Sequence, residues 1–191
     1  MAITLQKGGN ISLSQEEPGL KRVIIGLGWD TGTAEGPVFD LDSSAFMLGP
    51  DGKVRGDGDF VFYNNLRSED GSVEHSGDNL TGVGRDDDER LEIDLSHVPA
   101  DIERIAVAAT IHEAGNRNQT FGTVGRAFIR CLNADTEREI ARYDLSSDCA
   151  SETSVVFGEL VRSDGDWQFR ALGQGHHGGL GPLARTYGVN A

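Results

Sequence analysis

Long apolar runs are missing from this chain of 191 residues, so no stretch approaches the roughly 18 to 20 residues that a membrane helix needs. The N-terminus lacks the charged start and the apolar centre of a secretory signal peptide. Cysteine is scarce, because only Cys131 and Cys149 are present, in different segments and without metal-ligand spacing. We therefore expect a cytoplasmic protein without membrane insertion, in which two buried or half-buried thiols stay reduced.

Basic residues are also few. The chain has 17 Lys and Arg against 31 Asp and Glu, which gives a net charge of −14. This balance argues against nucleic acid or an anionic membrane surface as a partner and favours cations, although acids that keep a surface soluble would give the same total. No linker, composition break or internal repeat follows residue 20. We therefore expect a single domain over residues 1–191.

Recognisable catalytic motifs are missing as well. The sequence has no G-x-S-x-G nucleophile elbow and no local set of Ser, His and Asp. The glycine-rich run at 173–179 precedes an expected helix, whose start could bind an anion, but it lacks the Lys-Ser/Thr pair of a phosphate loop. The five histidines are scattered, which makes zinc a weak candidate. We predict that the protein is not an enzyme.

Short alternating segments dominate what is present. In residues 21–29 apolar side chains recur at every second position, while Gly26 and Gly28 lie on the other face, where a second backbone or a ligand could approach. Residues 1–14 resemble a short hairpin, and 178–187 a short helix. Further strands are expected at 38–48, 59–65, 91–95, 102–111, 125–132, 137–145, 153–162 and 166–172. The pattern predicts an all-β fold, an antiparallel β-sandwich with a long acidic loop and a short C-terminal helix.

Acidic residues gather in residues 57–94, which hold twelve acids against three arginines and include the run Asp86 to Glu89. Such a run repels itself unless water, salt or a bound cation neutralises it. Calcium takes roughly six to eight oxygen ligands from carboxylates, amides and carbonyls, which this stretch supplies. The EF-hand pattern is absent and the flanks are strands. We interpret the stretch as part of a calcium site, with a solvated acidic loop as the alternative.

Strand polarity decides which of these donors can meet. If the strands expected at 38–48 and 59–65 pair antiparallel, the end of one lies beside the start of the other. Five donors then share one edge of the sheet: Asp30, Asp40, Asp42, Asn64 and Asn65. Asp57 and Asp59 fall at the opposite end, about 23 Å away, and cannot share an ion with them. Asp40 and Asp42 could also act as paired carboxylates in acid–base chemistry, but two acids on one strand face more often bind a cation or face solvent.

Signature segments spread over nearly the whole chain resemble a known family. In order they are Lys7-Gly8-Gly9-Asn10, Gly26-Leu27-Gly28-Trp29-Asp30, Phe39-Asp40-Leu41-Asp42, Phe60 to Asn65, Gly77-Asp78-Asn79-Leu80-Thr81-Gly82, Asp87-Asp88-Glu89 and Gly173-Gln174-Gly175. Together they resemble the TerD family of tellurium-resistance and stress proteins. The resemblance implies a bacterial cytoplasmic β-sandwich that binds calcium, as two ions, and acts in resistance to tellurite and other stresses.

The resemblance also carries over a set of ligands and partners. The matching motif residues, as calcium ligands, are Asp30, Asp40, Asp42, Asn64, Asn65, Asp78, Asn79, Asp87, Asp88 and Glu89. Arg85 departs from the family pattern, and its charge would lower the affinity of a neighbouring site or pair outward without effect. Implied partners are other proteins of the resistance system, for which a membrane component is one candidate. We hypothesise that calcium orders the acidic loop for partner interaction; the alternative is an enzyme acting on tellurium oxyanions or another small anion.

Overall fold

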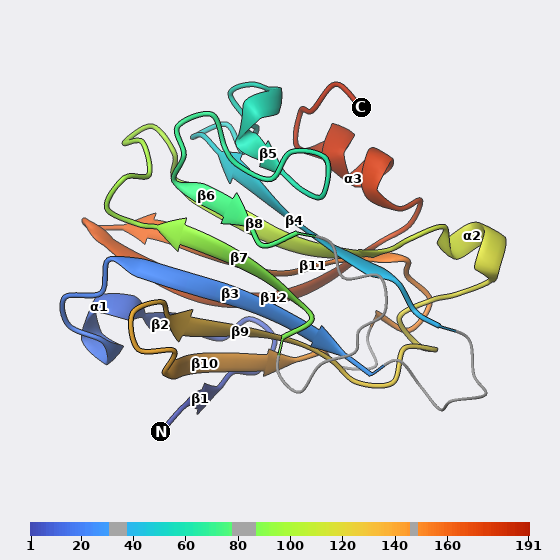
Figure 1. Cartoon of the computed structure of the whole chain (residues 1–191), viewed down its shortest axis with the longest axis horizontal. Helices are drawn as coiled ribbons and strands as arrows, with labels where there is room; N and C mark the ends of the chain where they lie inside the picture. The colour runs from blue at the N-terminus through green and yellow to red at the C-terminus, as the bar shows by residue number, and fades with distance from the viewer. Residues whose placement is uncertain (31–37, 78–86, 146–148) are drawn as a thin grey trace.

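The computed structural model describes residues 1–30, 38–77, 87–145 and 149–191. In these residues the strands form two six-stranded sheets that pack face to face (Figure 1). Neighbouring strands are antiparallel except for β1 (Ile3–Thr4) and β10 (Glu139–Asp144), which run parallel. The β-sandwich predicted from the alternating segments is therefore confirmed.

Each sheet combines strands from early and late parts of the chain. Sheet A has the order β1, β10, β9 (Ala127–Asn133), β3 (Arg22–Trp29), β7 (Glu89–Asp94) and β6 (Val73–His75). Sheet B has the order β2 (Asn10–Ser12), β12 (Asp166–His176), β11 (Ser154–Ser163), β8 (Arg104–Ile111), β4 (Leu41–Leu48) and β5 (Phe60–Val61). The helices of the described residues are α1 (Leu13–Glu16), α2 (Ala114–Arg117), α3 (Leu180–Thr186) and the 3-10 turn η1 (Asp57–Asp59). None of them is long and apolar enough to cross a membrane.

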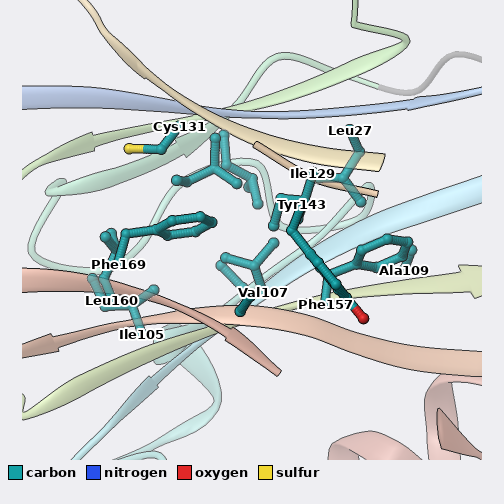
Figure 2. Packing of buried hydrophobic residues seen from close by; sticks show 14 of the residues in the cluster. Leu27, Ile105, Val107, Ala109, Ile129, Cys131, Tyr143, Phe157, Leu160 and Phe169 are labelled. Atoms are coloured by element: carbon teal, nitrogen blue, oxygen red, sulfur yellow. The ribbon is translucent and has the colours of Figure 1, made fainter. Parts of the chain in front are cut away.

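The main core lies between the two sheets, where alternate residues of each strand point inward. The four apolar residues of β3 that the sequence places on one face are all buried there. Figure 2 shows Leu27 and Ile129 of sheet A opposite Val107 and Phe157 of sheet B. Each fully buried side chain of this kind contributes roughly 1.5 to 3 kcal/mol to folding. The apolar side chains at every second strand position therefore hold the two sheets together.

A second, smaller core covers the outer face of sheet B. Phe46 and Phe60 stack there with ring centroids 4.7 Å apart, and Tyr187 lies 4.6 Å from Phe46. Leu183 of α3 is buried in the same cluster, and Figure 1 shows α3 beside β4 and β8. This helix was predicted at 178–187. Sheet B is covered on both faces here, and both residues of β5 are therefore apolar and buried.

The hairpin predicted for residues 1–14 is wrong. β1 joins sheet A, where Ile3 pairs with Ala141, whereas β2 joins sheet B, where Ile11 pairs with Phe169. The turn at Lys7-Gly8-Gly9-Asn10 therefore carries the chain from one sheet to the other instead of folding it back on itself. Leu5 lies buried in the main core at this crossing. Partner strands late in the chain, which local alternation does not reveal, decided this outcome.

Two further expectations are corrected near the acidic stretch. The strand predicted at 59–65 ends at Val61, because Phe62 and Asn65 exchange backbone hydrogen bonds of 3.0 and 2.9 Å and reverse the chain. The loop predicted at 66–90 contains β6, which pairs with β7. The expected polarity is confirmed nonetheless, since Phe60 pairs with Phe46 and so places Asp59 at the far end of β4 from Asp42.

Candidate metal-binding end of the sandwich

Trp29 gathers the chain at one end of the sandwich. Its backbone N–H donates to Asp88 Oδ2 at 2.8 Å, and its indole Nε1–H donates to the carbonyl of Phe39 at 3.3 Å. The first bond holds the start of β7 against the end of β3, and the second holds the segment before β4 against β3. Asp30 and Asp40 directly follow these two contacts in sequence. Three predicted ligands, Asp30, Asp40 and Asp88, therefore lie around one tryptophan.

The Asp88 carboxyl, directly before β7, has a shifted pKa. Burial raises its pKa, the Trp29 N–H opposes that rise, and the negative charges of Asp87, Glu89 and Asp30 raise the pKa further. The net shift is upward. Like charges within a partly buried site disfavour ionisation. A cation bound beside Asp88 would favour the ionised carboxylate and so oppose that upward shift.

Glu89 points into the interior between the sheets, where its side chain is fully buried. Its Oε2 accepts the backbone N–H of Ser43 at 2.6 Å. β5 pairs with Ala45 and Phe46, so among the described residues no strand extends to Ser43 on that side of β4. The carboxylate thus replaces a missing strand partner and fixes β7 against β4, close to Asp42.

His75 completes this buried network without forming a catalytic triad. The Gly77 N–H donates to His75 Nδ1 at 2.9 Å, so the ring proton sits on Nε2, which lies 2.8 Å from Ser43 Oγ and 3.4 Å from Glu89 Oε2. A serine–histidine–carboxylate triad needs the serine and the carboxylate on opposite ring nitrogens. Here both lie at Nε2, and all three side chains are buried. The network holds β4, β6 and β7 together.

Asp42 lies on the outer face of sheet B, opposite Thr110 in the β4–β8 register. Its Oδ2 is 3.4 Å from His112 Nδ1, and the residue is 6% exposed. Asp40 precedes it by two positions and accepts the backbone N–H of His112 at 2.8 Å through its carbonyl. Both acids are buried at the end of β4 that faces Trp29. Both predicted ligands therefore lie near the same end of β4.

The two asparagines are placed less favourably. The Asn65 side-chain amide donates to the carbonyl of Phe60 at 2.7 Å and so stabilises its own turn. Asn64 is exposed. The member of this turn that shares a pocket with Asp42 is Tyr63. The turn lies at the predicted end of β4, but no hydrogen bond between described residues joins either asparagine to the acids.

Asp87 lies apart from the other predicted ligands, on the outer face of sheet A. Its Oδ1 accepts from Arg130 Nε at 2.5 Å and its Oδ2 from Arg90 Nε at 3.0 Å, and its side chain is fully buried. Arg90 and Arg130 are the strand neighbours of Gly26 on either side. The missing side chain at Gly26 leaves the space that the carboxyl fills. The sequence predicts a close approach at Gly26 but does not identify Asp87 as the residue that approaches.

Asp78 and Asn79 lie outside the described residues. Among residues 1–30, 38–77, 87–145 and 149–191, no three His, Cys, Asp or Glu side chains are grouped closely enough to hold a metal ion by themselves. The described carboxylates therefore supply part of a coordination sphere at most. Further oxygen donors would have to complete it.

Comparisons with known proteins agree with the sequence motifs. The family model described as the TerD domain matches residues 1–187. The chain is 54% identical over 191 residues to tellurium resistance protein TerD of Serratia marcescens, covering 100% of both. It is 49% identical over 190 residues to general stress protein 16U of Bacillus subtilis (strain 168), covering 99% of this chain and 98% of that protein. The crystal structure of a homologue of telluride resistance protein (TerD) from Streptomyces coelicolor A3(2) matches with a TM-score of 0.70 and 26% identity, covering 87% of this chain and 96% of that one. The chain belongs to the TerD family.

Proposed function

We propose that this chain is a non-enzymatic calcium-binding protein of a tellurium-resistance and general stress-response system. The observation that supports the proposal is that carboxylates from separate segments lie toward one end of the sandwich, where further oxygen donors could complete a coordination sphere. Asp30 and Asp88 come from sheet A, and Asp40 and Asp42 come from sheet B. Asp88 is partly buried in the field of neighbouring acids. A divalent cation would turn that repulsion into attraction.

The donor chemistry favours calcium over a softer metal. Carboxylate oxygens suit calcium, whereas zinc prefers thiolate and imidazole ligands. Both ring nitrogens of His75 already have hydrogen-bond contacts, and both cysteines are buried free thiols. We extend the proposal to say that bound calcium prepares this end of the sandwich to contact other proteins of the resistance system. The names of the relatives refer to tellurium resistance and to general stress, and this biological setting supports the proposal.

Calorimetric titration with calcium, and with magnesium as the comparison ion, tests the proposal. We expect calcium binding below millimolar concentration and weaker magnesium binding, because magnesium demands a near-ideal octahedral site. Asp88→Asn should weaken calcium binding at least about 10-fold, since it removes a charged ligand. Asp57→Asn is the matched control, because Asp57 accepts the Asn190 N–H at the other end of β4. Absence of binding below millimolar calcium, or equal losses in both variants, would refute the assignment.

A reductase acting on tellurium oxyanions is the rival function. Thiolate chemistry would need an accessible, acidic cysteine. Burial raises the pKa of Cys131 to about 12, and Cys149 is also buried and donates to the carbonyl of Gly173 at 3.3 Å. These surroundings favour inert thiols. Loss of tellurite in the presence of purified protein and a reductant, abolished by Cys131→Ser, would restore the enzymatic reading.

A further inference from the structure

A row of polar side chains crosses the outer face of sheet B beyond the cover of α3. Asp42 pairs with Thr110, Thr110 pairs with Ser154, and Ser154 pairs with His176 in the strand register. Directly paired residues of an antiparallel sheet project from the same face. The neighbouring positions on this face, Ala106, Ala108 and Val156 among them, are apolar and packed under α3. The polar row therefore begins where the apolar cover ends.

Several groups at this place are buried without a hydrogen-bond partner among the described residues. They are the Oγ atoms of Ser44 and Ser154, Thr153 Oγ1 and His176 Nε2. Ser44 and Ser154 are fully buried. Most buried polar groups in folded proteins are paired, and each exception calls for a water or ligand partner. Of these four groups Thr153 lines the pocket described next, and its unpaired hydroxyl is available to a polar occupant.

A pocket of about 380 Å³ opens beside this row. It lies between the paired ends of β4 and β8, the turn after β8, and the residues that lead into α3. Its polar lining consists of Asp42, Tyr63, Thr110, His112, Glu113 and Thr153. Pockets for small molecules range from roughly 300 to 1,000 Å³. The volume suits a small organic molecule and is far larger than a single ion requires.

The charge of the lining selects the kind of molecule. Asp42 and Glu113 contribute carboxylates, and the described lining residues include no Lys or Arg. Within the lining, Asp42 Oδ2 lies 3.4 Å from His112 Nδ1. The contact of Glu113 with Arg117 at 3.8 Å joins two exposed side chains and is weak. Burial, and then the charge of His177, lower the pKa of His176, which disfavours its positively charged form. The pocket therefore disfavours anions and favours a cation that donates several hydrogen bonds.

We propose that this pocket binds a small organic amine, whose ammonium group is held by carboxylate and hydroxyl oxygens. An ammonium group offers three donors, which matches hydroxyl and carboxylate acceptors placed around one point. The ring of Tyr63 adds an aromatic face, to which a cation is attracted. The site is separate from the calcium function proposed above, although Asp42 borders both. The test therefore uses variants other than Asp42.

Titration calorimetry with putrescine, a linear diamine, tests the proposal, and 1,4-butanediol serves as the neutral molecule of matched length. We expect putrescine to bind and butanediol to bind at least 10-fold more weakly. Thr110→Val removes a lining hydroxyl at constant shape and should weaken putrescine binding about 10-fold. Thr4→Val is the control, because Thr4 is exposed on an edge strand of the other sheet.

Thr153→Val separates binding from folding. Its hydroxyl lines the pocket and has no partner among the described residues, so its loss should leave the thermal midpoint unchanged or raise it, while putrescine affinity falls. Asp88→Asn should leave putrescine affinity unchanged, so a failure of calcium binding and a failure of amine binding are distinguishable. No putrescine binding at 10 mM, equal affinity for butanediol, or unchanged affinity in both Thr110→Val and Thr153→Val would overturn the proposal.

Discussion

Gly26→Ala is the substitution whose cost can be worked out most directly from the structure. A Cβ atom at this position would overlap the carboxyl group of Asp87. The carboxyl would have to leave the space between Arg90 and Arg130, whose side chains are 32% and 14% exposed. Breaking a buried ion pair costs roughly 3 to 5 kcal/mol. Replacing glycine by alanine inside a strand returns about 0.5 to 1 kcal/mol of backbone entropy.

The expected net loss is therefore about 2 to 4 kcal/mol. For a domain of 150 to 250 residues each kcal/mol shifts the thermal midpoint by roughly 2 to 4 °C, so calorimetry should show a fall of about 4 to 16 °C. Gly115→Ala is the matched control, because nothing lies within 4 Å of a Cβ at that helical position. A midpoint for Gly26→Ala equal to or above that of the parent would refute the assignment of Asp87 to this ion pair.

Two further predictions concern titratable groups away from the proposed site. Burial opposes ionisation of Asp70, but hydrogen bonds from Ser72 and Ser68 and the charge of Arg55 prevail and lower its pKa. The ionised Asp70 carboxylate therefore stabilises the fold above the unfolded pKa of about 3.9, and this contribution is lost as the pH falls through the lowered folded value. Between pH 5 and pH 3 the free energy of unfolding, measured with urea, should fall less in Asp70→Asn than in the parent. An equal fall in both proteins would contradict this role. Burial raises the pKa of Cys131 to about 12. This thiol should therefore resist alkylation by iodoacetamide at pH 8 in the native protein and react once urea unfolds the chain. Rapid labelling of Cys131 in the native protein, located by mass spectrometry, would show instead that the thiol is accessible.

Much of the fold could be predicted because local alternation reports which face of a strand is buried. β3 and β8 carry apolar residues at every second position, and both lie where the pattern places them. The polarity of β4 and β5 also followed from the short connection between them. These features depend on residues that are close in sequence. They can be predicted because antiparallel pairing brings such residues together.

The candidate site could be predicted only in part, because alternation does not say which sheet face a strand shares with another. Asp87, Asp88 and Glu89 are consecutive, yet they face the outside of sheet A, the end of the sandwich and its interior, respectively. Because the three acids are consecutive, the sequence alone does not show that their side chains occupy three different places. The useful signal for Asp87 was Gly26, flanked in the sheet by Arg90 and Arg130, and that arrangement depends on strand register.

The split N-terminal segment has a consequence for the order in which the protein is assembled. β1 needs β10 and β2 needs β12, so the first twelve residues wait for partners that lie more than 120 positions later in the chain. Pairings at such separation carry a large loop-closure cost and form slowly. During synthesis the outer edges of β10 and β12 must therefore emerge before either can be covered. The strands β1 and β2, although early in this sequence, are therefore among the last to pair in their sheets.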